Sequence, residues 1–454
     1  MATHTAHGDT SHLSFWRHVR EFAVPPAMIE TATARRLSGD WAGALTAARV
    51  DLDFRIRDVV RAHGREFTDH LLADLHRLAP DLLRWHLPRT APDGLLRPGL
   101  TVPLARYPGE RPVALVVRTP PAWADFGQRI GLALWDGSAN GGPPLQHPHP
   151  HPSRRFRFDL HRHLWDAGRS GEFAARAGTG GPSGLPAADT VAAGLRCAVD
   201  RWGAEAGLLL RAEGRPAGPV AVRLGRRRML LLEPGAAGVA AVRPVGDARE
   251  ARGLPLLPDA ATWVAPDLDL LRSGTLGPEL LHPLVARALA PGHARGPVRP
   301  GGAGEAGRAG GFGGPGLVDC RGAVHRIGLV DGVLAPLDHA PAELRRERLL
   351  IALSGTPLPC LRAVERAHRR PHELAGLRER LDHGDVDGAL AAVEAVLGPQ
   401  ARLREGPLRD ALAAIEERRS TYERYRAGLA TPGPDAVAFR RRDRRPKDHW
   451  SHPR

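Results

Sequence analysis

Apolar side chains recur at helical spacing over the first 90 residues of the chain. One-sided apolar patterns cover residues 13–22, 27–37, 41–50 and 65–83, and this periodicity predicts helices. Pro26 suits the first turn of the second helix, and Asp40 follows Ser38-Gly39 at a position where it would cap the third. Residues 1–98 are therefore expected to form a helical region.

After Pro92 the pattern changes to short apolar runs bounded by Gly, Pro and Asp, which are typical of strands. These runs cover residues 100–107, 112–118, 129–135, 220–232 and 238–244. One clear helix is predicted over residues 190–205. Because strand and helix do not alternate regularly, residues 99–290 are expected to form an α+β domain with a mostly antiparallel sheet.

The C-terminal part begins after a segment rich in Gly, Ala, Arg and Pro. This segment, residues 291–316, has too few apolar side chains to fold and is predicted to be a linker. Residues 317–430 are expected to form a β-hairpin followed by a helical domain. The predicted strands are 317–320, 324–329 and 333–337, and the predicted helices are 341–354, 358–369, 372–383, 386–397 and 407–426. Residues 431–454 are expected to be a basic disordered tail.

Two segments of the chain share the pattern G-D-x-x-G-A-L-x-A. They are residues 39–47 and 384–392. In each, the Asp can cap the second helix of a hairpin, and Gly-Ala-Leu lets that helix approach the first closely. The pattern resembles the turn and second helix of a tetratricopeptide-type hairpin. That resemblance implies a peptide- or protein-binding helical surface at each end of the chain. Ordinary helical hairpins are the alternative, because a solenoid needs about three stacked repeats.

The basic residues are almost all arginine. Lys447 is the only lysine among 64 Lys and Arg residues. A phosphate-binding loop of the G-x-x-x-x-G-K-[ST] kind and a buried catalytic lysine are therefore excluded. A GC-rich genome explains this skew most simply. It also makes the net charge of +14 weaker evidence for an anionic partner than such a charge would otherwise be.

The cysteines and the hydrophobic runs indicate the compartment. Cys197, Cys320 and Cys360 are far apart and odd in number, so they predict no disulfide framework. The N-terminal residues lack an apolar signal segment, and no run approaches the ~18 apolar residues of a membrane span. We therefore expect a cytoplasmic protein without a membrane partner.

Histidines supply the best sequence evidence for an enzyme. The run of His and Pro at 147–152 favours polyproline II, in which successive His rings diverge. His161 and His163 would share one face with Asp159 on a strand, an arrangement used by metal ligands. On a helix capped by Asp159 the two rings would point apart. A divalent metal at Asp159, His161 and His163 is thus one interpretation, and a hydrogen-bonded polar loop is the other. No other cofactor is expected.

Weaker candidates for chemistry lie elsewhere in the chain. The carboxylate pairs Asp51/Asp53, Asp267/Asp269 and Asp385/Asp387 have a spacing that can hold a cation, although Asp385 is better explained as a helix cap. Cys320 could pair in space with His325 or His339. The tail carries basic residues that could contact phosphates without sequence preference: Arg440, Arg441, Arg442, Arg444 and Arg445.

These features support three hypotheses about function, and whether the protein is an enzyme stays uncertain. The first is a non-catalytic protein-interaction or scaffold component with a protein partner. The second is a metal-dependent hydrolase whose site is Asp159, His161 and His163. The third is a nucleic-acid-associated protein that binds nonspecifically through its basic tail. The absence of a recognisable catalytic motif makes the first hypothesis the preferred one.

Overall fold

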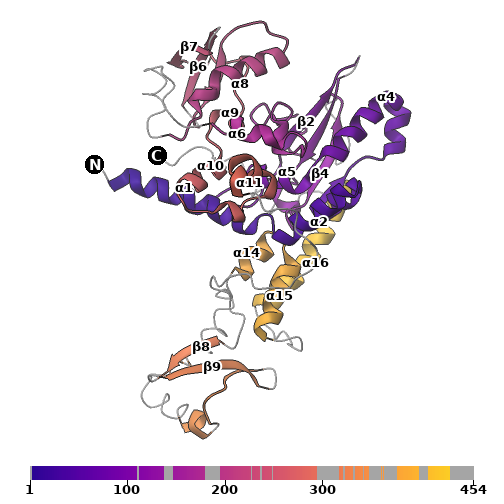
Figure 1. Ribbon diagram of the computed structural model, residues 1–454. Coiled ribbons are helices and arrows are strands. Elements are labelled where there is room, and N and C mark those ends of the chain that lie inside the picture. The colour runs from indigo at the N-terminus through magenta and orange to yellow at the C-terminus, as the bar shows by residue number, and fades with distance from the viewer. Residues whose placement is uncertain are drawn as a thin grey trace. The chain divides into compact units, whose positions relative to one another are not determined.

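The structure is a computed structural model of the 454-residue chain (Figure 1). It describes residues 3–109, 112–137, 147–178, 195–225, 228–235, 238–247, 249–293, 316–320, 323–330, 333–340, 342–346, 359, 361, 376–397 and 407–429. The chain divides into two compact units. Unit 1 comprises Met1–Gly296 and Thr421–Arg454, and unit 2 comprises Pro297–Ser420.

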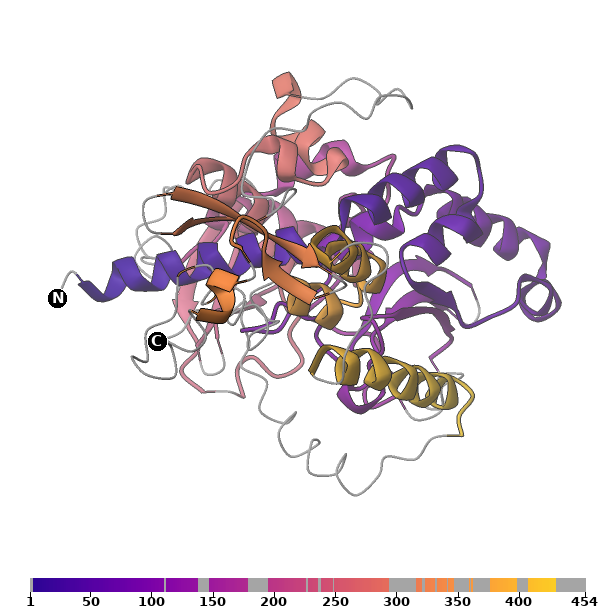
Figure 2. The same ribbon diagram turned by 90° about the horizontal axis from the view of Figure 1, so that it is seen from below.

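Unit 1 contains most of the described helices. Its α-helices are α1 (Thr3–Phe22), α2 (Pro26–Leu37), α3 (Trp41–Ala47), α4 (Ile56–Arg77), α5 (Pro80–His86), α6 (Phe173–Arg176), α8 (Val199–Ala212), α9 (Asp259–Thr262), α10 (Pro266–Arg272) and α11 (Pro283–Leu289). Short 3₁₀ turns are η1 (Ala122–Ala124), η2 (Arg162–Leu164), η3 (Ser170–Glu172), η4 (Pro278–Leu280) and η5 (Pro291–His293). Figure 2 shows α1 as one long continuous helix.

Two sheets complete unit 1. The larger contains β1 (Val50–Leu52), β2 (Thr101–Tyr107), β3 (Val113–Arg118) and β4 (Ile130–Trp135) in the order β1-β4-β3-β2. β1 pairs with β4 in parallel, and the other pairs are antiparallel. The smaller sheet is antiparallel, in the order β5-β6-β7, and contains β5 (Val220–Arg223), β6 (Met229–Gly235) and β7 (Gly238–Pro244).

The main core of unit 1 lies between the N-terminal helices and one face of the larger sheet. Leu75 of α4 and Leu83 of α5 pack in the same cluster as Leu115 and Val117 of β3. Because side chains alternate along a strand, the intervening Val116 belongs to a separate small cluster with Ala114 and Ala133. The helices of residues 1–98 and the sheet that follows them therefore share one core.

A second core forms where α8 packs against the smaller sheet. Trp202, Ala206 and Leu209 of α8 repeat at helical spacing and are buried together with Val222 and Leu232 of β5 and β6. An isolated antiparallel β-bridge between Cys197 and Trp263 connects the segment before α8 to the residue after α9. Residues 259–267 therefore run from this second core to the helix α10, which packs in the first.

Arg84 of α5 forms hydrogen bonds to the turns that precede two strands. Its side chain is fully buried and donates to three carbonyl oxygens, those of Ala48 at 3.0 Å, Gln128 at 2.7 Å and Arg49 at 3.3 Å. Arg49 and Gln128 have φ angles of 57° and 54°, a left-handed conformation that is unfavourable for residues other than glycine. Arg49 directly precedes β1, and Gln128 lies two residues before β4. Arg84 therefore stabilises the turns that lead into both strands.

The end of helix α16 (Pro407–Arg426) also packs within unit 1. Tyr422 donates to Asp51 at 2.7 Å, and Arg426 donates to Asp53 at 2.6 Å. Tyr422 and Tyr425 cluster with Ala124 of η1. The C-terminal end of this predicted helix therefore contacts other parts of its own chain.

Unit 2 contains a small sheet and the second helical hairpin. Its strands are β8 (Gly316–Cys320), β9 (Ala323–Val330) and β10 (Val333–Pro336), antiparallel in the order β10-β9-β8. Its helices are α14 (Leu377–Asp382), α15 (Val386–Leu397) and the first part of α16. Most of the predicted linker and the whole predicted tail lie outside the described residues, as do most of the helices predicted between 341 and 372.

The α+β class predicted from the sequence is confirmed. Four local predictions were wrong. The helix predicted over residues 190–205 begins only at Val199, since Cys197 forms a β-bridge with Trp263 and residues 195–198 are not helical. Residues 41–50 are not one helix, because the left-handed Arg49 ends the helical turn and Val50 begins β1. The predicted helix 65–83 is two helices, separated where Leu78 is extended and Pro80 starts α5. The predicted strand 220–232 is the pair β5 and β6.

The described helices were also compared with the requirements of a membrane span. None of those in the described ranges is both long enough and apolar enough to cross a bilayer.

Substituting Arg84 by Met should lower the free energy of unfolding by about 3 kcal/mol or more, because three buried carbonyl groups would lose a charged donor. Urea unfolding followed by circular dichroism measures this loss. Arg61→Met is the matched control, since Arg61 is exposed and pairs only with the exposed Asp58, and it should stay within about 0.5 kcal/mol of wild type. Equal losses in the two variants would contradict the role assigned to Arg84.

Candidate functional site

The turn between α2 and α3 is fixed by one glycine and one aspartate. Gly39 has a φ of 82°, and the carboxylate of Asp40 caps α3 by accepting from the Gly43 amide at 2.8 Å. Arg35, on the last turn of α2, donates to Asp40 at 3.1 Å. The backbone amide of Asp40 also bonds to the Arg35 carbonyl at 2.9 Å.

The second copy of the pattern builds the same turn between α14 and α15. Gly384 has a φ of 78°, and Asp385 accepts from the Gly388 amide at 3.2 Å. Arg380 donates to the Asp385 carboxylate at 2.9 Å, and the backbone amide of Asp385 donates to the Arg380 carbonyl at 2.6 Å. The sequence repeat is therefore a structural repeat that includes an arginine five residues before the aspartate.

Both copies require glycine at the third helical position after the aspartate. A Cβ on Gly43 would overlap the Oδ2 atom of Asp40, and a Cβ on Gly388 would overlap the Oδ2 atom of Asp385. The repeat differs in what covers its leucine. Leu45 is 4% exposed and packs in the main core of unit 1, whereas the matching Leu390 is 38% exposed.

The predicted metal-site residues Asp159 and His161 both contact Arg157, one through its side chain and the other through its carbonyl oxygen. Asp159 accepts from Arg157 at 2.9 Å. His161 places Nδ1 2.9 Å from the Arg157 carbonyl and Nε2 3.3 Å from a carboxylate oxygen of Glu205. The His161 and His163 ring centroids are 5.7 Å apart. A metal site formed by Asp159, His161 and His163 stays a hypothesis.

Across the described residues, no three His, Cys, Asp or Glu side chains are grouped so that they could hold a metal ion. Five of the six carboxylates in the Asp-x-Asp pairs contact arginines: Asp51, Asp53, Asp267, Asp269 and Asp385. Asp51 accepts from Arg129 and Tyr422. Burial alone would raise the pKa of Asp51, but these donors outweigh it and lower the pKa. Asp53 is more deeply buried, and burial raises its pKa despite Arg426.

Of the proposed pairing between Cys320 and His325 or His339, the structure describes only the two histidine side chains. His325 and His339 face each other, with Nδ1 of the first 2.7 Å from Nε2 of the second. The side chain of Cys320 lies outside the described residues, as do Arg440, Arg441, Arg442, Arg444 and Arg445 of the tail.

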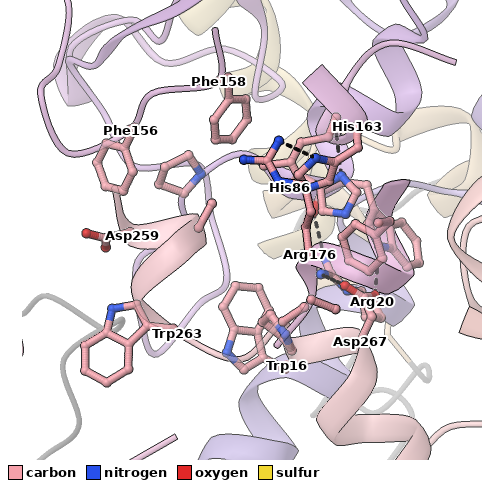
Figure 3. Close-up of a pocket in the computed structure, with 18 residues that line it drawn as sticks. Trp16, Arg20, His86, Phe156, Phe158, His163, Arg176, Asp259, Trp263 and Asp267 are labelled. Atoms are coloured by element: carbon pink, nitrogen blue, oxygen red, sulfur yellow. Dashed lines mark hydrogen bonds and ion pairs between the residues drawn. The ribbon is translucent and has the colours of Figure 1, made fainter. Parts of the chain in front are cut away.

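A pocket lies between the two cores of unit 1, lined by residues of α1, α5, η2, α6, α9 and α10 (Figure 3). Its cavity volume is about 50 Å³, and it is partly open to solvent. Aromatic rings form much of the lining, and they come from Trp16, Trp85, Phe156, Phe158, Phe173 and Trp263. The polar lining consists of two ion-paired arginines, two histidines and two aspartates: Arg20, Arg176, His86, His163, Asp259 and Asp267.

One wall of the pocket is a buried ion pair between α1 and α10. Arg20 donates to both carboxylate oxygens of Asp267, at 2.9 and 2.7 Å, and to the Trp85 carbonyl at 2.6 Å. The Trp85 indole N–H also donates to Asp267 at 2.9 Å. The guanidinium lies over two rings, 5.1 Å from Trp16 and 4.6 Å from Trp85. Burial opposes the charge of Asp267, but Arg20 outweighs it and lowers the pKa of Asp267.

The histidines lie on the same side of the pocket as this ion pair, across from Phe156, Asp259 and Trp263 (Figure 3). Burial lowers the pKa of His86 to about 4, and burial together with His161 and Arg176 lowers that of His163. Arg176 donates to both oxygens of Glu205, at 2.8 and 2.5 Å. Burial alone would raise the pKa of Glu205, but the contacts with His161 and Arg176 outweigh it and lower the pKa to about 2. Both imidazoles are therefore neutral at pH 7.

The sequence predicted His163 as a metal ligand and Asp267 as part of a carboxylate pair, but it did not predict the pocket that both residues line. Arg20 carried a usable signal, because it lies in the buried stripe formed by Trp16 and Val19 of α1 and by Ala23 just after α1. A charge in an apolar stripe requires a buried partner. That partner, Asp267, lies 247 positions away, and nothing in the sequence near Arg20 identifies it.

Comparison with protein-family models, with curated proteins and with solved structures finds no match to this chain.

Substituting Gly43 by Ala should destabilise the wild-type protein by about 1 kcal/mol, because the new methyl group displaces the Asp40 cap. In an Asp40→Ala background the same substitution should instead stabilise by about 0.5–1 kcal/mol, since Ala favours a helix over Gly. Denaturant unfolding of the four proteins measures the coupling. Equal effects of Gly43→Ala in both backgrounds would contradict the proposed contact.

The free energy of unfolding should fall as the pH drops from about 6.5 to 4. The unfolded chain binds a proton on His86 near pH 6.5, whereas the folded protein binds it only near pH 4, so acid favours unfolding by on the order of 2–3 kcal/mol at pH 4. His86→Asn, which keeps a donor toward the Leu82 and Leu164 carbonyls, should show a shallower decline. Comparing each protein with itself at pH 8 removes the packing effect of the substitution. An unchanged pH dependence in the variant would contradict this account.

Proposed function

We propose that the protein is a non-catalytic, cytoplasmic interaction component that binds a protein partner through its repeated helical turn. The observation that carries this proposal is the difference between the two copies. Both have the same left-handed glycine, capping aspartate and arginine, yet Leu45 is buried in a core while Leu390 is exposed.

The first copy indicates what the second would bind. Leu45 is covered by other apolar side chains of the main core in unit 1. Leu390 occupies the same position on α15 and is 38% exposed, although the preceding Ala389 is 1% exposed, like Ala44 of the first copy. A protein surface that presents apolar side chains to Leu390 would bury it as the core buries Leu45.

A second exposed leucine lies beside the first turn. Leu37, at the end of α2, is 74% exposed. The outward face of α2 also exposes the small side chains of Ala27, Thr31 and Ala34, together with the charged side chains of Glu30 and Arg35. The turn of each hairpin thus has one large apolar side chain available for a partner.

Substituting Leu390 by Glu should reduce retention of a stoichiometric protein partner about tenfold, because it places a charge where the partner buries an apolar group. Leu37→Glu tests the first turn separately. The measurement is capture from lysate of the source organism after nuclease treatment, quantified by mass spectrometry. Leu429→Glu is the matched control, since Leu429 is 72% exposed and lies outside both hairpins, and it should retain the partner.

The same experiment separates the alternative functions. Loss of bound material with nuclease, or on removal of residues 440–454, would contradict the proposal and favour binding of nucleic acid by the tail. Retention of the partner by Leu37→Glu, Leu390→Glu and the double variant would show that the hairpins are not the binding surface. A purified protein with stoichiometric metal that is lost in His161→Ala with His163→Ala would favour the hydrolase.

A further inference from the structure

The end of α16 lies against a small surface of unit 1, which we call the α16 site. Its members are Asp51 and Asp53 at the end of β1 and the aromatic side chains of Trp123 and Phe126 in and after η1. Asp53 also lies against β4, since a Cβ on Gly131 would overlap its carboxylate. The site therefore combines two acidic groups with two aromatic rings.

Two residues of α16 bind the carboxylates. Tyr422 donates to Asp51 at 2.7 Å, and Arg426 donates to Asp53 at 2.6 Å and lies 3.3 Å from Asp51. Because residues four positions apart share a helix face, both side chains reach the site from the same side of α16. Burial raises the pKa of Asp53, and Arg426 opposes that effect. A buried carboxylate without a cation is unfavourable, so the site favours an occupant that is positively charged there.

The aromatic rings bind the same segment. The Tyr425 and Trp123 rings meet edge-to-face with centroids 5.5 Å apart, and the Tyr422 and Phe126 centroids are 6.3 Å apart. Tyr422 is 5% exposed and Tyr425 is 4% exposed. The site thus fits a helix end that carries two tyrosines and an arginine.

The α16 site does not depend on its occupant for a core. Among the described residues, the two main cores of unit 1 are formed by side chains from residues 13–289, and α16 contributes only to the small cluster around Ala124. Residues 297–420, which form unit 2, intervene between the end of α16 and the rest of unit 1. The occupant is therefore distant in sequence from its site, and the same segment of a second copy offers the same contacts.

We propose that the α16 site accepts the end of α16 from a second copy of this chain, giving a dimer in which two copies exchange residues 421–426. The exchanged segment makes the same contacts as it makes within one chain, so exchange costs little. Within one chain, covalent linkage raises the effective concentration of the segment to roughly the millimolar range, which favours the monomer in dilute solution. This association is separate from the hairpin surfaces proposed above.

The test uses two full-length variants with opposite charge reversals, Asp53→Arg and Arg426→Asp. Each variant alone brings like charges together, within the chain and between copies, and should be monomeric. In an equimolar mixture the native Arg426 of one variant pairs with the native Asp53 of the other, and the two introduced charges also pair. Sedimentation equilibrium should show a 1:1 complex whose Kd is at least about tenfold below that for self-association of either variant.

Two controls separate this pairing from a general effect of charge. A chain with both substitutions restores the pair internally and should be monomeric like wild type. Asp58→Arg mixed with Arg61→Asp is the matched control, since this exposed ion pair lies outside the site, and that mixture should also stay monomeric. If the Asp53→Arg and Arg426→Asp mixture stays monomeric although circular dichroism shows both variants folded, or if one variant alone associates as well as the mixture, the proposal is overturned.

A peptide tests the same site without a substitution in it. Arg426→Asp leaves the four residues of the site unchanged, and the Arg426 side chain is 33% exposed, so this variant is expected to fold. A synthetic peptide of residues 407–429 should bind it at least about tenfold more tightly than the same peptide with Arg426→Asp, and more tightly than it binds the wild-type protein, whose site is occupied. The ¹⁵N-labelled indole N–H signal of Trp123 reports binding by NMR. Equal binding of the two peptides, or no saturable shift, would contradict the proposal.

Discussion

The buried pair of Arg20 and Asp267 is the interaction on which unit 1 depends most. It joins residues 247 positions apart and connects α1 to α10, while Trp85 of α5 binds both members of the pair through its carbonyl oxygen and its indole N–H. A buried charge without its partner destabilises a protein by about 3–5 kcal/mol, so the pair forms only when all three helices are in place. The guanidinium also lies between two tryptophan rings, and its fixed position makes the adjoining wall of the pocket rigid and electrically neutral.

Arg84 is a second buried arginine that joins distant parts of unit 1. Its hydrogen bonds go to carbonyl oxygens of two turns and not to a carboxylate. Those turns contain the left-handed Arg49 and Gln128, which a local reading of the sequence treats as helix and loop. The short strand β1 was missed for this reason: its conformation is imposed by a side chain 35 positions later, and its three residues carry too little pattern to reveal a strand.

The features predicted correctly are those determined by nearby residues. The capping role of Asp40 and of Asp385 requires only the amide three positions later, and most strands of the larger sheet follow from short apolar runs. The Asp159, His161 and His163 cluster was a weaker prediction, since its geometry depends on contacts made across the fold. Glu205 approaches His161 from α8, and Arg176 approaches His163 from α6. Neither approach has a signal in the sequence around residue 160.

The two hairpins show why a local motif is insufficient to define function. Identical turns leave Leu45 buried and Leu390 exposed, so the motif fixes the shape of the turn but not what its second helix packs against. In unit 1 the same chain supplies that cover, and the leucine contributes to stability. In the second copy the leucine is left uncovered, and burying it would release free energy to binding instead of folding. An apolar side chain that the fold leaves exposed is therefore better evidence for a partner than the motif itself.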